Sequence, residues 1–266
     1  MDRPHLVALL VVLVGIVAVP VSLTAFDPPT ANSLSADQTY PAGAGPDSVD
    51  FEALDADEHN VSYAPREHWD AYVLNYTEPD EGARVEGVYY INSTTGEILA
   101  DRWHDAKVYR HGKTYVFYQP ASGLDEHRRE MFEADNQFVY DDTTDAFYRY
   151  DPHVGKIHPT TIGRHPDILE LYTWEAVGTE NHYGVPVLVY RATGERSGDY
   201  VPQLVEGTFE LGVDDGVIYG FDITVREEGE YHYTYDVAPT EFPDHEWVDT
   251  AERLAGNTTS DNTSSS

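Results

Sequence analysis

The chain has 266 residues, of which 41% are hydrophobic, so it is long enough and apolar enough to build a sizeable folded core. Its 16 Lys and Arg stand against 48 Asp and Glu, and the resulting net charge of -32 argues against nucleic acid as a partner. It has no cysteine, which excludes disulfides, thiolate metal sites and a cysteine nucleophile.

The carboxylates are spread along the whole chain instead of being gathered in one tail. Such a surface repels itself in ordinary salt, whereas at molar ionic strength the Debye length falls to about 3 Å and screens the repulsion. The composition is therefore typical of a protein from an extreme halophile. The charge indicates a solvent of high salt concentration and says little about function.

Residues 1–26 are expected to form a transmembrane anchor or a signal segment. Arg3 precedes an uncharged, mainly apolar run from Leu6 to Phe26 that is long enough to span a bilayer. Near its end Ala25 is small but Leu23 is not, so the usual small-x-small cleavage pattern is lacking and an uncleaved anchor is favoured over a cleaved signal. Both alternatives export the rest of the chain, and the favoured anchor places it at the cell membrane, facing the extracellular side.

Residues 27–60 are rich in Pro, Ala, Ser, Gly and Asp and are expected to be a flexible linker. The folded domain is expected over residues 61–255, and residues 256–266 are expected to be a disordered polar tail. Five Asn-x-Ser/Thr acceptors for glycosylation agree with export. They are Asn60, Asn75, Asn92, Asn257 and Asn262.

Short strands joined by tight turns dominate the predicted domain, which indicates an antiparallel sheet of many strands. Residues 146–151 predict one short strand between two groups of hairpins. The predicted turns lie at residues 93–96, 111–112, 182–184, 214–216 and 226–230.

Alternation along the last three predicted strands makes one face apolar and leaves the other polar. The apolar face is expected to carry Phe209, Leu211, Val213, Val217, Tyr219, Phe221, Ile223, Val225, Tyr231, Tyr233, Tyr235 and Val237. The strand after Gly184 differs, because Val187 and Val189 on one side and Leu188 and Tyr190 on the other make both of its faces apolar. Its second face must therefore meet another segment or a cavity.

Four segments carry helical signals. The spacing of Trp69 to Tyr76 favours a helix, although a strand also fits. Ser122 is expected to cap a second helix, Pro166 to open a third, and Gly256 to end a fourth. These helices are expected to cover the apolar face of the sheet.

Motifs for catalysis or metal binding are lacking in the sequence. There is no G-x-S-x-G, S-x-x-K or G-x-x-x-x-G-K motif, so no catalytic residue and no cofactor is predicted. The polar groups Asp222, His232 and Asp236 are interpreted as paired side chains on a wet sheet face. An enzyme is the least supported class, and a buried acid-base pair with displaced pKa values would be its sign.

Two polar clusters have spacings that do not match a metal site. The histidine spacing matches no zinc pattern, and the aspartate spacing does not match a calcium loop, so no metal is predicted and the aspartates are expected in a solvated turn. The clusters are His153, His158 and His165, and Asp141, Asp142 and Asp145.

Several stretches together resemble a known group of proteins. They are "YTWEAVGTENHYGVPVLVYRATG", "GTFELGVDDGVIYGFDITV", "EYHYTYDV" and the closing "FPDHEWVDTA". This order resembles exported haloarchaeal lipoproteins of unknown function, which in turn are similar to the LolA/LppX lipoprotein-carrier superfamily. The haloarchaeal relatives commonly carry a lipidated cysteine, which this chain lacks, so its anchor would be the Leu6 to Phe26 segment.

The resemblance implies an α+β fold, in which a strongly curved antiparallel sheet forms a half-barrel and a few helices cover its concave apolar face. It also implies an apolar cavity for acyl chains. The 20 Tyr, 9 Phe and 4 Trp suit such a lining, although core packing alone also explains them. The expected lining residues are Leu188, Tyr190, Phe209, Leu211, Tyr219, Phe221, Tyr233 and Tyr235.

The leading functional hypothesis is therefore a membrane-anchored domain that binds a hydrophobic or lipid-like ligand in the cell envelope. Its expected partners are the membrane, through the N-terminal segment, and a lipid or lipid-anchored protein. The alternative is a structural or protein-interaction domain without catalysis. A continuous apolar tunnel would favour the first, and a filled core would favour the second.

Overall fold

The computed structural model describes residues 32–54, 68–80, 83–102, 105–154, 166–198 and 200–261. The expected membrane segment, the sequons at Asn60 and Asn262, and His158 and His165 lie outside these ranges. Within the described ranges, no helix is both long and apolar enough to cross a membrane.

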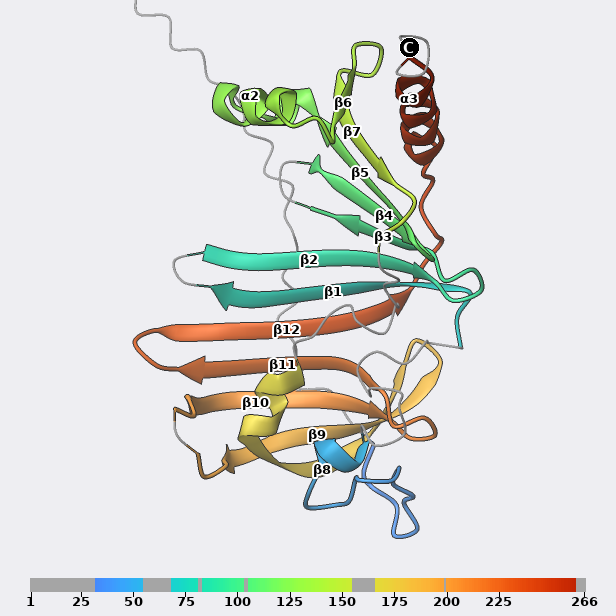
Figure 1. Cartoon of the computed structure of the whole chain (residues 1–266). Helices are drawn as coiled ribbons and strands as arrows, with labels where there is room; N and C mark the ends of the chain where they lie inside the picture. The colour runs from blue at the N-terminus through green and yellow to red at the C-terminus, as the bar shows by residue number, and fades with distance from the viewer. Residues whose placement is uncertain are drawn as a thin grey trace, which may run out of the picture. The chain divides into compact units, whose positions relative to one another are not determined.

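Twelve strands make up one antiparallel sheet in the described part of the chain. They are β1 (Ala71–Asp80), β2 (Ala83–Asn92), β3 (Ile98–Asp101), β4 (Lys107–His111), β5 (Thr114–Pro120), β6 (Val139–Asp141), β7 (Ala146–Asp151), β8 (Tyr172–His182), β9 (Val185–Glu195), β10 (Gln203–Gly212), β11 (Ile218–Arg226) and β12 (Glu230–Pro239). Their order is β6-β7-β5-β4-β3-β2-β1-β12-β11-β10-β9-β8, with β6 and β8 at the open edges (Figure 1). The predicted antiparallel sheet of many strands is confirmed.

The predicted turns between these strands are also confirmed. Four of them contain a glycine at positive φ, a conformation that other residues adopt only with strain: Gly96, Gly112, Gly184 and Gly216. The turn between β11 and β12 closes through a hydrogen bond from the amide of Glu227 to the carbonyl of Gly229.

The first strand lies in the middle of the sheet, beside the last one (Figure 1). Strands β1 to β7 build one half and β8 to β12 build the other, and the halves join where β1 pairs with β12. Tyr76 stands opposite Tyr235 at this junction. The pairing connects residues far apart in the sequence, so both halves belong to one hydrogen-bonded ladder.

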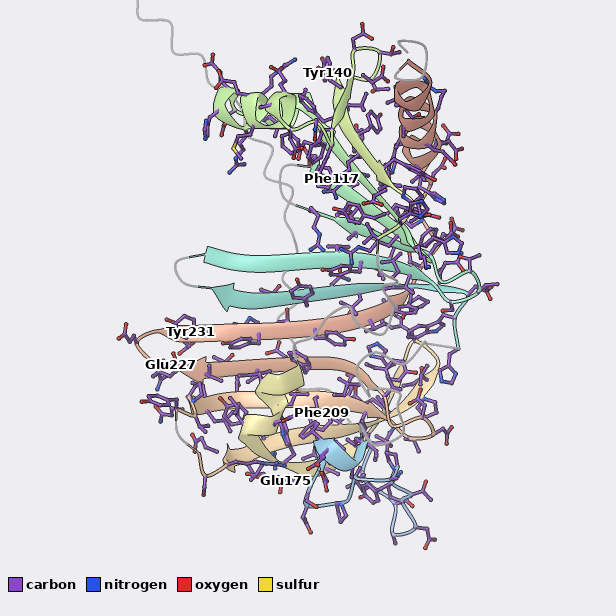
Figure 2. The ribbon with its side chains drawn as sticks, in the orientation of Figure 1. Phe117, Tyr140, Glu175, Phe209, Glu227 and Tyr231 are labelled. Carbon is purple, nitrogen blue, oxygen red and sulfur yellow. The ribbon has the colours of Figure 1, made fainter. Side chains whose placement is uncertain are left out.

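The largest core lies on the face of the sheet that carries Phe209, Phe221 and Tyr235, which we call the Phe209 face. Helix α1 (Phe51–Leu54) and the 3₁₀ helix η4 (Pro166–Leu171) contribute to it. The indole nitrogen of Trp174 donates to the carbonyl of Leu169 at 2.8 Å, and its ring meets Phe209 edge-on with centroids 4.7 Å apart. These contacts close the core over strands β8 to β10, where Figure 2 labels Phe209.

The opposite face, which we call the Tyr219 face, is covered by α3 (Trp247–Asp261) at strands β5 and β7. Ala251 is buried there in one cluster with Leu99, Val116 and Tyr148. The expectation that the helices cover a single apolar face is therefore wrong, because the strands of this half carry apolar side chains on both faces.

Helix α2 (Glu126–Ala134) packs on the Phe209 face at the same end of the sheet, so Figure 1 shows α2 and α3 on either side of β6 and β7. The ring of Phe132 lies 6.1 Å from that of Phe117 and 5.3 Å from that of Phe147. Asp125 and not Ser122 caps α2, since its carboxylate accepts from the amide of Arg128 at 2.8 Å. Ser122 lies in the preceding 3₁₀ turn η2 (Ala121–Gly123).

Two further helix predictions need correction. The segment from Trp69 to Tyr76 enters β1, where every second residue from Tyr72 to Tyr76 is buried in the core, as the period of a strand requires. Helix α3 continues through Gly256 to Asp261, because Gly256 does not adopt the positive φ of a helix-ending glycine. The helix predicted after Pro166 is confirmed only as the short η4.

The segment expected to be a flexible linker packs against the sheet over residues 32–54. Asn32 forms a β-bridge with Thr179, and the amide of Ala176 donates to the carbonyl of Pro46 at 2.8 Å. Val49 is only 2% exposed. The apolar side chains near the end of this segment join the core, which a polar linker would not do.

Candidate functional site

The residues expected to line a ligand cavity are mostly packed against one another. Leu188, Tyr190, Phe209, Leu211, Tyr219, Phe221 and Tyr235 are at most 5% exposed, and Tyr233 is half-buried. The rings of Tyr190 and Phe209 stack with centroids 4.8 Å apart. Leu188 and Leu211 stand opposite each other on β9 and β10. A ligand among these four side chains would have to replace contacts that the core already makes.

A β-bulge separates Tyr219 from the other predicted lining residues. Glu210 of β10 pairs with Gly220, but the next residue, Leu211, pairs with Ile218, so β11 has one extra residue at this point. Ile218 therefore belongs to the core of the Phe209 face, while Tyr219 belongs to a cluster on the other face. The prediction that Tyr219 shares a face with Phe221 is wrong, because strict alternation assumes an unbroken register.

The second apolar face of β9 meets this separate cluster. Val185 and Val187 pack with Val217 and Tyr219, and the indole of Trp69 lies against them, edge-on to Tyr219 at 5.7 Å. Val217 and Tyr219 reach this face because of the bulge. Both faces of β9 are thus apolar because each is covered by other side chains.

An aromatic row crosses the Phe209 face at the junction of the two halves of the sheet. It consists of Phe221, Tyr235, Tyr76 and Tyr89 on β11, β12, β1 and β2. Phe221 and Tyr235 stack at 5.3 Å with an angle of 8°, and Tyr76 and Tyr89 stack at 6.0 Å with an angle of 15°. Gly87 lies beneath Tyr76, and a Cβ there would overlap the tyrosine ring. The row therefore depends on a glycine next to it.

Half-buried aromatic side chains extend beyond the row on both sides. Tyr231 and Tyr233 continue it along β12, and Tyr115 and Phe117 stand on β5. Figure 2 labels Tyr231 near the β11–β12 turn and Phe117 near α2. Their rings pack against the core while part of each surface stays accessible, which suits contact with an amphiphile.

A cluster of titratable side chains lies on the Tyr219 face, in the half of the sheet away from α3. The Nδ1 atom of His182 lies 2.5 Å from Oε2 of Glu210, and the two side chains are 8% and 14% exposed. The Nε2 atom donates to the carbonyl of Val237 at 2.6 Å. Since a carbonyl only accepts, Nε2 carries a proton, and a second proton on Nδ1 gives the ring the positive charge that faces the Glu210 carboxylate.

The pKa of His182 is raised by its partners. Burial by itself lowers it, but the hydrogen bond and charge of Glu210, the Val237 carbonyl and the charge of Asp236 together outweigh burial. Burial and the charge of Glu210 raise the pKa of Asp236 and of Glu180, against the opposing charge of His182. The cluster therefore holds its protons more firmly than isolated side chains would.

Local sequence patterns do not indicate this cluster as a unit. Alternation places Glu180 and His182 on one face of β8, but Glu210 and Asp236 join them only through the register of five strands, β8 to β12. Asp222 and His232 form the exposed pair that was predicted, with Oδ1 and Nε2 2.8 Å apart.

The other polar predictions are placed as follows. Asp141, Asp142 and Asp145 lie at the β6–β7 turn, where Asp141 accepts hydrogen bonds from Thr143 and Thr144. In the described residues, no group of three or more His, Asp or Glu side chains is arranged to hold a metal ion.

Three of the predicted glycosylation sites fall within the described ranges. Asn75 is exposed on β1, Asn92 accepts from the amides of Thr94 and Thr95 at 3.0 Å, and Asn257 lies within α3. Of Asn75 and Asn92, whose side chains the structure describes, Asn75 is the more exposed.

Two grooves lie near α3. One of about 560 Å³ is lined from β7 by Tyr148, Arg149 and Tyr150 and from α3 by Ala251 and Leu254. A smaller one of about 90 Å³ lies between Tyr90, Leu99, Lys107 and Trp247. Neither groove is lined by the eight predicted residues, by the aromatic row or by the His182 cluster.

No protein-family model and no curated protein matches the chain. Among solved structures, it is similar to MucB, solved in complex with MucA(peri), at 12% identity and a TM-score of 0.26 over 67% of this chain and 53% of that one, so it spans about half the length of MucB. It is also similar to a LolA superfamily protein from Nitrosomonas europaea, at 9% identity and a TM-score of 0.22 over 74% of this chain and 96% of that one. A third is an outer membrane lipoprotein-sorting protein domain from Vibrio parahaemolyticus, at 8% identity and a TM-score of 0.17 over 68% of this chain and 90% of that one. The LolA superfamily, which the sequence resembles, is thus among the neighbours, but these TM-scores carry no argument about function.

Proposed function

We propose that the domain binds a hydrophobic, lipid-like ligand on the half-buried aromatic side chains of the Phe209 face, at the extracellular side of a membrane to which residues 6–26 hold it. The observation that carries this proposal is a set of half-buried aromatic side chains that pack on the core of this face and keep part of their surface accessible: Tyr231, Tyr233, Tyr115 and Phe117. The four rings of the aromatic row are at most 9% exposed, so they belong to the core on which these side chains pack. Of the expected ligand residues, Tyr233 belongs to the accessible part.

The free energy of such binding follows from the length of the buried acyl chain. Each methylene of an acyl chain that leaves water contributes about 0.8 kcal/mol, so about ten methylenes supply about 8 kcal/mol. The loss of translational freedom and the ordering of the chain offset part of this. With an offset of about 4 kcal/mol, about 4 kcal/mol remains, which corresponds to a dissociation constant of about a millimolar, and each further methylene tightens the binding. Tyrosine rings suit the site because they offer an apolar face and a polar tip.

The test uses the full chain purified in molar salt. Lipid is extracted from the preparation and identified by mass spectrometry, and a fluorescent monoacylglycerol probe is titrated. Tyr231→Glu places a charge beside the row and should weaken probe binding about tenfold or more. The matched control is Tyr200→Glu, because Tyr200 is 98% exposed, and it should bind the probe like the wild type.

Circular dichroism shows that each variant is folded before binding is compared. If a folded wild-type preparation contains no stoichiometric lipid and does not bind the probe, the lipid proposal fails. The alternative, a structural or protein-interaction domain of the cell envelope, would then stand, and the groove between β7 and α3 would be the first surface to test.

A further inference from the structure

Three arginines gather on the Phe209 face beside the aromatic row. The guanidinium carbon of Arg102 lies 5.0 Å from the centre of the Tyr89 ring. Those of Arg110 and Arg149 lie 5.4 and 5.6 Å from the centre of the Tyr115 ring. Strands β4 and β5 place Arg110 directly opposite Tyr115. We call these five residues the arginine site.

Two of these arginines lack the partners that arginines have elsewhere in this protein. Several other arginine side chains pair with carboxylates: Arg128 with Asp125, Arg129 with Glu133, Arg191 with Glu175 and Arg226 with Glu230. Arg149 of the arginine site lies 3.8 Å from Asp151. Arg102 and Arg110 pair with no carboxylate of the described residues.

This arrangement leaves two positive charges near each other without a carboxylate partner. The chain has three acidic residues for every basic one, so carboxylate partners are abundant. Arg110 is nevertheless half-buried, and its burial and the like charge of Arg102 lower its pKa. Two guanidinium groups that repel each other beside aromatic rings form a surface to which an external anion adds the missing charge.

We propose that Arg102 and Arg110 bind the anionic head group of the lipid-like ligand, a phosphate or a carboxylate, while its chain lies against the half-buried aromatic side chains of the Phe209 face. This inference rests on the function proposed above and names the chemical class of its ligand. Guanidinium groups present several donors in a planar fork that matches the oxygens of such a head group. The contacts with Tyr89 and Tyr115 hold both forks in place.

The experiment compares two amphiphiles with the same chain, dodecyl phosphate and dodecyl maltoside, below their micelle-forming concentrations. Binding to the full chain in molar salt is measured by titration calorimetry, and inorganic phosphate is measured alongside. The wild type should bind dodecyl phosphate at least about tenfold more tightly than dodecyl maltoside, and inorganic phosphate more weakly than either.

The double variant Arg102→Gln/Arg110→Gln should lose the preference for dodecyl phosphate and keep its affinity for dodecyl maltoside. The matched control is Arg226→Gln, which removes an arginine paired with Glu230 on the surface and should keep the preference. Retention of dodecyl maltoside binding also shows that the double variant is folded.

Each of the remaining outcomes contradicts a different part of the two proposals. Equal affinity for both amphiphiles in the wild type, or a preference that survives in the double variant, overturns the head-group assignment and leaves the lipid proposal standing. Binding of inorganic phosphate as tight as that of dodecyl phosphate reduces the arginine site to a site for a free anion. If neither amphiphile binds, the lipid function itself fails.

Discussion

The imidazole of His182 and the carboxylate of Glu210 form a pair that is almost fully buried, with Nδ1 2.5 Å from Oε2. The pair lies on the Tyr219 face, away from both grooves and from the aromatic row. A buried acid-base pair with displaced pKa values is the expected sign of an enzyme. Here the second nitrogen of the ring is bound to the Val237 carbonyl, so both nitrogens are engaged in holding strands together.

We predict that this pair makes stability depend on pH. The folded pKa of His182 is raised, so the stability that its charge contributes is complete below the unfolded value of about 6.5 and is lost as the pH rises through the folded pKa. The raised pKa values of Asp236 and Glu180 act in the same direction from about pH 4 upward. His182→Gln should cost about 3 kcal/mol at pH 6 and flatten the dependence above pH 6.5.

Thermal unfolding between pH 6 and pH 9 measures this effect. His232→Gln is the control, since it removes a histidine from an exposed pair with Asp222 and should leave the slope unchanged. Equal slopes for the wild type and His182→Gln would show that the pair does not govern the pH dependence.

A second prediction concerns salt. The net charge of -32 makes the acidic surface self-repelling, so the domain should lose thermal stability when the salt concentration falls from molar to about 0.1 M. Circular dichroism melts across a series of KCl concentrations give the measurement. A melting temperature that stays constant across the series would contradict the prediction of a halophilic protein.

A third prediction tests the aromatic row through its glycine. Gly87→Ala places a methyl group where the ring of Tyr76 lies, so it should destabilise the domain by about 1–3 kcal/mol and disturb the stack of Tyr76 on Tyr89. Gly194→Ala is the control, because the nearest atom to its added Cβ is 3.6 Å away, at Thr173. Chemical unfolding measures the loss in stability of each variant. Equal losses for Gly87→Ala and Gly194→Ala would mean that the contact of the added methyl group with Tyr76 does not destabilise the domain.

A fourth prediction concerns the N-terminus. Residues 6–26 should remain on the mature protein, because the run is long enough to span a bilayer and lacks a good cleavage pattern. The intact mass of protein recovered from membranes gives the answer. A mature chain that begins between about Ala25 and Tyr40 would instead identify a secreted protein.

Much of the sheet was predictable from local patterns. Turn glycines such as Gly96 and Gly184 set hairpins between neighbouring strands, and alternation separated Leu188 from Val187 on β9. These features depend on residues a few positions apart, so their physical cause is contained in short stretches of chain. The acidic composition likewise follows directly from counting residues.

Other features were decided only by the tertiary structure. The bulge that turns Tyr219 away from Phe221 exists because β10 and β11 pair with one residue in excess, and no local pattern marks it. The pairing of β1 with β12 places Tyr76 beside Tyr235, and the register of β2 to β5 brings Arg102 and Arg110 to the same face. Both candidate sites are assembled from strands distant in sequence. The amino-acid sequence alone therefore determined the strands, the turns and the charge, whereas long-range pairing decided which side chains meet.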